Sequence, residues 1–208
     1  MNRKKLKAAE QRFLDLYPMG FMNPEMQKIV KKHRLQKMVD LTHELFTKKN
    51  FSDAREVATN MSKVISRSSM VSVFEKPKFR DLIPTLESRR LKALADGMKD
   101  FLHGNRKNGF TAIVDVLAPA KLAKWSLVTV IPNYYWPDKE VFVKPTTAKG
   151  VIEHFELTGL IYKPQPTWEF YESYRKEILE MKSKVDKSIA SSNAAFCGFL
   201  MMSLKKDD

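Results

Sequence analysis

The sequence predicts a mostly α protein, a multi-helix globular bundle with at most a short β element near 140–165. Apolar residues recur at the i, i+3, i+4 and i+7 spacing of an amphipathic helix in several segments, most clearly in 87–103. Pro, Gly and capping residues fall between these segments, where helices are expected to start and stop. With 208 residues the chain is long enough to bury a core without disulfides or metals.

Two helices are expected at the N-terminus, with a break between them. The first covers about 3–16 and ends before the Pro and Gly of 18–20. The second starts at 23–25, where Asn offers an N-cap oxygen, Pro suits the first helical position and Glu lies in the positive first turn. We expect it to continue to about residue 48. Its apolar face changes at the basic run 31–34, which indicates a bend or contacts with two neighbouring helices.

Three more helices are predicted before residue 105. One begins at Ser52 and Asp53, because both residue types favour the N-cap position. A short one covers 78–83, between two Pro residues. The third is the amphipathic segment 87–103, and Gly104 is a suitable residue to end it.

The centre of the chain is expected to hold a basic loop and two buried helices. Residues 105–109, Asn-Arg-Lys-Asn-Gly, are predicted to form the loop. The apolar stretches 110–117 and 120–131 then predict two helices hinged at Pro119. The aromatic run 133–138 is expected to follow as another loop.

The C-terminal third starts with a predicted extended piece at 140–144, because Pro145 disfavours the α conformation of the residue before it. Thr146 and Thr147 are candidate caps for a helix that follows. After a further extended piece, Thr167 is expected to cap the last long helix, whose first turn carries glutamates.

The stretch 142–168 is open to two functional interpretations. It is either a nucleic-acid-reading helix with a wing or a structural corner. In the first case the residues that face nucleic acid are Lys144, Thr147, Lys149 and His154. In the second case Tyr162 and Trp168 clamp the last long helix against the preceding one. Because Glu153 and Glu156 would repel DNA, the structural corner is the favoured interpretation.

The same stretch carries a Lys-Pro-Thr start, an amphipathic helix and then the pattern Tyr-x-x-x-Pro-x-Trp-x-x-Tyr. The matching residues are Lys144, Pro145, Thr146, Tyr162, Pro166, Trp168 and Tyr171. This pattern resembles an uncharacterised family of helical bacterial proteins. The resemblance spans 144–171 of the 208 residues, and it implies an intracellular helical fold with no assigned activity.

The charge of the chain is strongly positive and unevenly distributed. The formal net charge is +13, and residues 1–100 alone carry +10, from 22 Lys and Arg against 12 Asp and Glu. A basic surface attracts polyanions such as nucleic acid, although it also serves simply to keep a protein soluble. The candidate polyanion-binding residues are Lys31, Lys32, Arg34, Arg106, Lys107, Lys144 and Lys149.

Three consecutive aromatic residues, Tyr134, Tyr135 and Trp136, form a second candidate binding cluster. If they are exposed, their rings are suited to stacking on nucleic-acid bases. If they are buried, they close the end of the helical core, and this is the favoured interpretation.

No metal-binding, phosphate-binding or nucleophile motif occurs in the sequence. The single cysteine, Cys197, lies in an apolar run and is expected to be a buried, inert thiol. We therefore expect neither a metal nor a cofactor. An enzyme whose site is assembled from distant residues near His154 and Tyr162 remains an alternative.

The likeness of the chain to exported or membrane proteins is weak. The N-terminus lacks the apolar core of a signal peptide. The most apolar run, 110–131, contains Asp115, Lys121 and Lys124, which a bilayer span would not tolerate. We expect a cytoplasmic protein without a membrane partner.

The sequence thus predicts a single helical domain over 1–208, with a candidate internal boundary at 104–109. The leading functional hypothesis is a non-enzymatic binding or accessory protein whose basic surface contacts a polyanion, for example nucleic acid. An alternative is a scaffold that self-associates as a homodimer. Its Met- and Phe-rich tail around 199–202 either packs into the core or supplies that contact.

Overall fold

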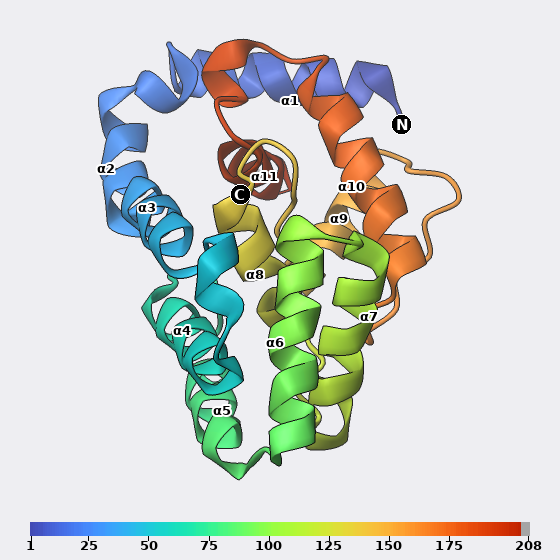
Figure 1. Ribbon diagram of the computed structural model, residues 1–208. Helices are drawn as coiled ribbons and strands as arrows, with labels where there is room; N and C mark the ends of the chain where they lie inside the picture. The colour runs from blue at the N-terminus through green and yellow to red at the C-terminus, as the bar shows by residue number, and fades with distance from the viewer. Residues whose placement is uncertain (205–208) are drawn as a thin grey trace.

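The computed structural model of the protein describes residues 1–204, and every regular element within them is a helix (Figure 1). This confirms the mostly α fold class; the segment 140–165 contains a helix and irregular chain but no strand. The α-helices are α1 (Arg3–Leu16), α2 (Pro24–His33), α3 (Leu35–Leu45), α4 (Ala54–Arg67), α5 (Glu75–Leu82), α6 (Ser88–His103), α7 (Arg106–Leu117), α8 (Trp125–Tyr135), α9 (Pro145–His154), α10 (Trp168–Lys182) and α11 (Asn193–Ser203). Across residues 1–204, each helix is too short or too polar for a bilayer span.

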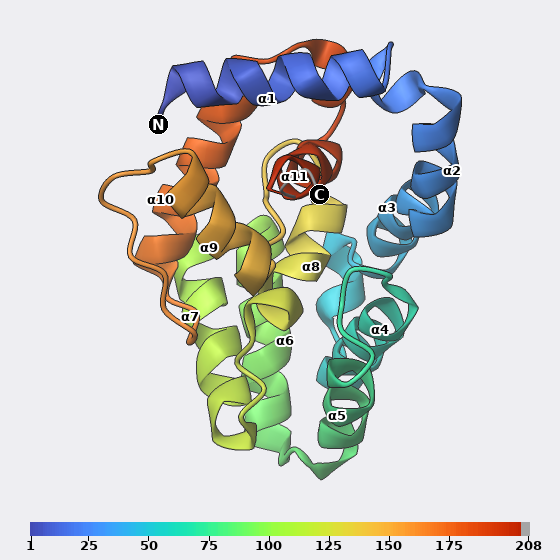
Figure 2. The same cartoon turned by 180° about the vertical axis from the view of Figure 1, so that it is seen from behind.

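The helices are arranged as a frame around the C-terminal helix. Helix α1 lies across one end of the molecule, α2 and α3 run down one side, and α10 runs down the other (Figures 1 and 2). Helix α11 lies inside this frame, and α8 passes through the middle of the molecule. The opposite end is formed by α4 with α5 and by α6 with α7. All residues from Trp125 to Tyr134 on α8 are buried, so this helix is the centre of the core.

The predicted helix starts at three positions are confirmed by side-chain capping. The Asn23 Oδ1 accepts a hydrogen bond from the Glu25 amide at 3.0 Å. Asp53 accepts from the amides of Arg55 and Glu56. Thr167 accepts from the Phe170 amide, and Trp168 is the first residue of the helix that follows. Each cap satisfies an amide that the helix itself leaves without an acceptor.

The single helix predicted from 24 to about 48 is wrong, because the chain breaks at Arg34. Arg34 has a left-handed backbone (φ 49°) and separates α2 from α3. The change of apolar face at the basic run 31–34 was the signal of this break. Because α2 and α3 have separate helix axes, the apolar face of each helix can contact the interior.

The basic loop predicted at 105–109 is also wrong, since α7 begins at Arg106. Asn105 caps it by accepting a hydrogen bond from the Asn108 amide at 3.1 Å. The reason for the short connection is a close approach of α6 and α7 at Gly109. A β-carbon there would lie 2.2 Å from the Phe101 backbone nitrogen. The two helices thus pack directly on each other, and the domain boundary suggested at 104–109 stays a prediction.

The loop predicted at 133–138 starts later than expected. Helix α8 continues through Pro132 to Tyr135. Proline lacks an amide hydrogen and so removes one hydrogen bond from the helix, but the buried surroundings of α8 hold its last turn in place.

A buried ion pair joins the second half of the fold. Glu140 is 1% exposed, and its Oε1 lies 2.6 Å from Nη1 of Arg106. The Tyr171 hydroxyl donates to the Glu140 Oε2 at 2.8 Å, and the side-chain amide of Asn193 donates through Nδ2 to the Glu140 backbone carbonyl at 2.9 Å. The network therefore connects α7, α10 and α11 through the irregular segment 136–144.

Removing one partner of this pair is expected to be costly, because it leaves a buried carboxylate without its counter-charge. We expect Arg106→Ala to lower the free energy of unfolding by about 2–3 kcal/mol in urea denaturation. The neighbouring Lys107→Ala is the matched control, because Lys107 forms an exposed ion pair with Glu169 at 3.1 Å. Equal losses for the two variants would contradict a special role for the Glu140 network.

Candidate functional site

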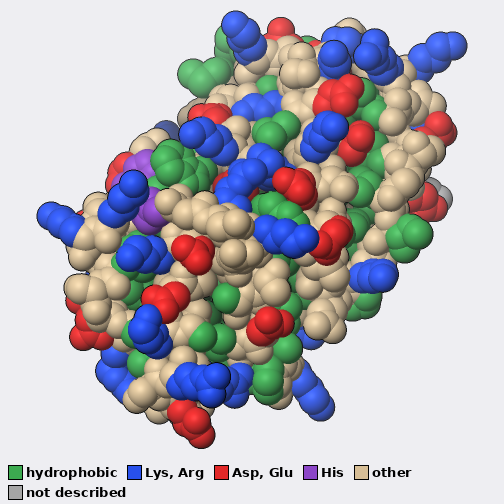
Figure 3. All heavy atoms as spheres, turned by 45° about the vertical axis from the view of Figure 1, so that its right-hand side comes forward, with side chains coloured by type: hydrophobic (Ala, Val, Ile, Leu, Met, Phe, Trp, Pro, Cys, Tyr) green, Lys and Arg blue, Asp and Glu red, His purple; other side chains and the backbone are tan. Residues whose placement is uncertain are grey.

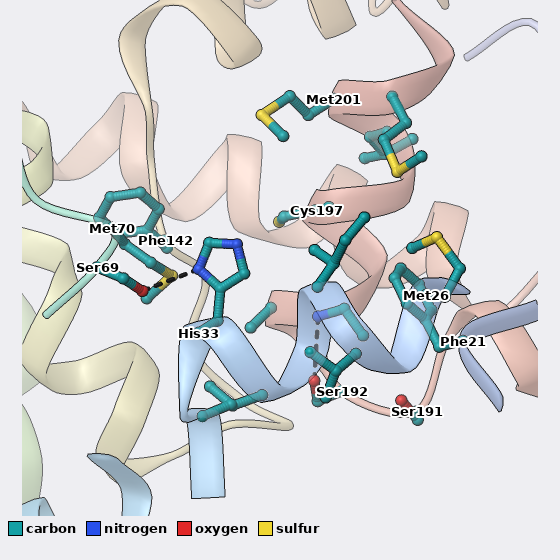
Figure 4. A pocket seen from close by; sticks show the side chains of 18 of the residues that line it. Phe21, Met26, His33, Ser69, Met70, Phe142, Ser191, Ser192, Cys197 and Met201 are labelled. Atoms are coloured by element: carbon teal, nitrogen blue, oxygen red, sulfur yellow. Dashed lines mark hydrogen bonds between the residues drawn. The ribbon is translucent and has the colours of Figure 1, made fainter. Parts of the chain in front are cut away.

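An apolar pocket of about 310 Å³ lies between α2 and α11 (Figure 4). Its remaining walls come from the segment that leads into α9 and from the chain after α4. The lining is unusually rich in methionine: Met22, Met26, Met70, Met201 and Met202. Methionine side chains are flexible and polarizable, so they adapt to apolar ligands of different shapes.

The hollow follows from the side chains on two facing helices. Helix α2 directs one stripe at helical spacing toward it: Met26, Ile29, Val30 and His33. The opposing turns of α11 carry small residues at the same place: Ala194, Ala195 and Gly198. A β-carbon on Gly198 would be 3.8 Å from the ring of Phe21, which is ordinary contact distance. Small side chains opposite a flexible stripe leave space that the core does not fill.

Few polar groups face the pocket. The Nδ1 of His33 is hydrogen-bonded to the Ser69 Oγ at 2.8 Å, which leaves its other ring nitrogen free (Figure 4). Burial, and then the charge of Lys32, lowers the pKa of His33, so the ring is neutral at pH 7. The pocket lining contains Lys144 but no Asp or Glu.

Some of the apolar lining reaches the surface. Met22 is 66% exposed, Ile29 42% and Met201 39%. These three residues belong to the pocket wall, so the hollow opens to solvent along an apolar rim.

Cys197 also lines the pocket, and its chemistry is that of an inert thiol. Burial raises the pKa of Cys197 to about 12, although the charge of Lys182 acts in the opposite direction. Because the thiolate is the reactive form, Cys197 is a poor nucleophile at neutral pH, as its apolar sequence context predicted.

The seven candidate polyanion-binding residues lie at different places in the fold. Lys31, Lys32 and Arg34 are exposed where α2 meets α3. Arg106 is bound to Glu140, and the Lys107 ammonium lies 3.1 Å from Glu169. The candidates on α2 are far from those on α7, because these two helices lie on opposite sides of the molecule (Figures 1 and 2).

The remaining two lysines are Lys144, in the pocket wall, and Lys149, whose Nζ is 5.0 Å from the ring centre of Tyr162. On the face that Figure 3 shows, Lys and Arg side chains are spread over the surface with Asp and Glu between them. This face has no coherent basic patch.

Of the three consecutive aromatics, Tyr134 is buried, as the favoured interpretation predicted, and Tyr135 and Trp136 are half-buried. Tyr134 is 1% exposed and hydrogen-bonded to Ser68 at 2.9 Å. Tyr135 is half-buried, with its ring centre 4.8 Å from that of His43. Trp136 donates its indole N–H to the Leu102 carbonyl at 3.1 Å. The ring of Tyr134 is therefore enclosed in the core, whereas base stacking by the half-buried rings of Tyr135 and Trp136 stays a prediction.

The two interpretations of 142–168 are resolved by the chain after α9. Residues 155–167 form no strand, so the predicted wing is absent from this segment. Thr147, proposed to face nucleic acid, is 9% exposed and lines the pocket. The structural corner is therefore the better description of the stretch.

The details of that corner differ from the prediction. The ring of Trp168 packs on Phe110 of α7, with 5.7 Å between ring centres. Tyr162 packs beside Trp125 of α8, and the Trp125 indole donates to the Lys163 carbonyl at 2.8 Å. The aromatic pair thus attaches α10 and its leading segment mainly to α7 and α8; only Tyr162, through Lys149, contacts the preceding helix α9.

The other sequence candidates do not converge on one place. No hydrogen bond or ring contact joins His154 to Tyr162 in the part of the chain that the structure describes. In the tail, Phe199 and Leu200 are buried, and Met201 and Met202 line the pocket. Phe199 and Leu200 therefore pack into the core, the first of the two predicted roles, whereas a homodimer contact through Met201 and Met202 stays a prediction.

The pKa of Cys197 leads to a labelling prediction. Relative to an ordinary cysteine pKa of 9.0, a value of about 12 reduces the thiolate at neutral pH roughly a thousandfold. We expect iodoacetamide to alkylate the folded chain far more slowly than the unfolded chain, at a rate that rises with pH up to at least pH 10. Mass spectrometry of the single cysteine gives both rates. Equal rates in the folded and unfolded chain would contradict the raised pKa of this half-buried thiol.

Comparisons with protein-family models, with curated proteins and with solved structures give no match for this chain. The resemblance to a bacterial helical family consequently stays an expectation from the sequence pattern. The pocket itself is the structural feature from which a function is inferred.

Proposed function

We propose that the chain is a non-enzymatic binding protein that holds a small, largely apolar molecule in the pocket between α2 and α11. The observation that carries this proposal is the pocket: about 310 Å³, walled by methionine and other apolar side chains, with few polar groups. Natural small-molecule sites have this size and this composition.

The size of the pocket limits its ligand. At about 30 Å³ per water-sized group, it accommodates roughly ten non-hydrogen atoms. Burying that much apolar surface supplies a favourable free energy of binding, and the flexible methionines reduce the need for an exact match of shape.

The polar groups in the pocket support binding better than catalysis. His33 is held by Ser69, and the Cys197 thiol stays protonated at neutral pH. A nucleophilic mechanism needs a base within hydrogen-bond reach of an activated nucleophile. His33 lies within hydrogen-bond reach of the Ser69 hydroxyl, but among the described residues no acidic side chain orients its ring, and no base is hydrogen-bonded to the Cys197 thiol.

Polyanion binding is a second candidate, and it is favoured by the α2–α3 corner. Lys31, Lys32 and Arg34 are exposed there, and none forms an ion pair with another residue in 1–204. An unneutralised cluster of this kind attracts phosphate groups in a salt-dependent manner.

The pocket proposal is tested by filling the hollow from α11. We expect the neutral probe 1-aminonaphthalene, whose size matches the pocket, to bind saturably, with a change in its fluorescence, and Gly198→Leu to weaken its binding at least about tenfold because the new side chain occupies the space. Gly198→Ala is the matched control: its β-carbon fits at 3.8 Å from Phe21, so binding should persist. The proposal fails if the natural chain does not bind the probe, or if both variants bind it equally.

Polyanion binding by the α2–α3 corner is tested with a labelled mixed-sequence duplex and a single strand at increasing salt. If it binds polyanions, the triple substitution Lys31→Gln, Lys32→Gln and Arg34→Gln should abolish a salt-sensitive retention that the natural chain shows at low ionic strength. Replacing the exposed Lys63, Arg67 and Lys78 instead provides a charge-matched control. Retention that is absent, or equally reduced by both sets, would remove this candidate.

A further inference from the structure

We propose that the ligand of the pocket is a single-chain amphiphile with a carboxylate head, which binds Lys144 and the first turn of α9. The inference rests on the proposed function of the pocket and adds the chemical class of the ligand. Three observations carry it, all on the same wall: a lysine without an ion-pair partner, a pocket-lining hydroxyl without a hydrogen bond to a described residue, and a helix start without a side-chain cap.

The lysine has no carboxylate to neutralise it. Lys144 is exposed and lines the pocket, and within residues 1–204 its ammonium forms no ion pair. Among the residues that the structure describes, its Nζ has one polar contact, with the Met201 sulfur at 3.9 Å. Since the lining has no Asp or Glu, the field in the pocket favours an anion.

The hydroxyl of Thr147 is the second polar group without a partner. Thr147 is 9% exposed and lines the pocket, and its side chain makes no hydrogen bond to any residue that the structure describes. The Thr147 hydroxyl oxygen is still accessible to solvent, so it is available to a molecule in the pocket as a donor or an acceptor. A ligand oxygen in the pocket would satisfy it.

The start of α9 adds two backbone donors beside these side chains. Lys144 occupies the N-cap position but makes no side-chain cap, and Pro145 has no amide hydrogen. The first turn closes with the Ala148 amide on the Lys144 carbonyl at 2.8 Å. The amides of Thr146 and Thr147 accordingly have no acceptor among the described residues. Free amides at the positive end of a helix are suited to an anion.

The rest of the pocket suits the tail of such a molecule. Beyond the α9 wall, the lining is methionine and aliphatic residues on α2 and α11. A saturated chain of roughly ten carbons matches the volume, with its head at Lys144 and its tail among the methionines. Decanoate is thus a suitable probe.

The test compares three ligands that share one tail. We expect decanoate to displace 1-aminonaphthalene about tenfold more tightly than decanol, and decylammonium to be the weakest, because only the carboxylate gains charge-assisted hydrogen bonds. Lys144→Gln should weaken decanoate about tenfold and leave decanol unchanged. Lys149→Gln, an exposed lysine on the same helix but on the Tyr162 ring, should change neither.

The outcomes separate the two proposals. If neither decanoate nor decanol binds, the proposed function of the pocket fails. If decanol binds but decanoate is no tighter, or if Lys144→Gln leaves the preference for decanoate intact, the pocket function stands and the carboxylate inference is overturned. Circular dichroism and thermal denaturation of each variant show whether it is folded.

Discussion

The buried carboxylate of Glu140 is the interaction on which the arrangement around the pocket depends. A carboxylate that is 1% exposed persists only when charged and hydrogen-bonding partners compensate for its lost hydration. Glu140 meets partners on α7, α10 and α11: Arg106, Tyr171 and Asn193. The chain that follows leads directly to Lys144, so the polar wall of the pocket takes its position from this network.

The core and the pocket are built from different kinds of side chain. Around α7, α8 and α10 the core consists of interlocked rings; Phe110 alone contacts Trp125, Trp168 and Tyr171. Such rings have few rotamers and pack as a rigid body. The pocket is instead lined by methionines and by the small residues of α11, which leave room and adjust to what enters. The molecule thus combines a rigid core with an adaptable cavity wall.

The sequence was most informative where a local interaction decides the structure. The caps at Asn23 and Asp53 were predictable because an N-cap depends on residues within one turn. The change of apolar face at 31–34 indicated a bend, but it did not predict the left-handed backbone of Arg34, which tertiary packing imposes on an ordinary residue. The pocket was also missed: its walls bring Met26 and Met201 together from opposite ends of the chain, and no spacing rule reports such a pairing. The regular stripe on α2 was the one available signal.

A crystal structure of the chain with bound ω-bromodecanoate tests the central claim most directly, because the anomalous signal of bromine locates the tail independently of the protein density. The account predicts bromine among the methionines of α2 and α11, with the carboxylate within hydrogen-bond distance of the Lys144 ammonium or the Thr147 amide. Bromine only on the outer surface, or a ligand bound with its carboxylate away from α9, would contradict it.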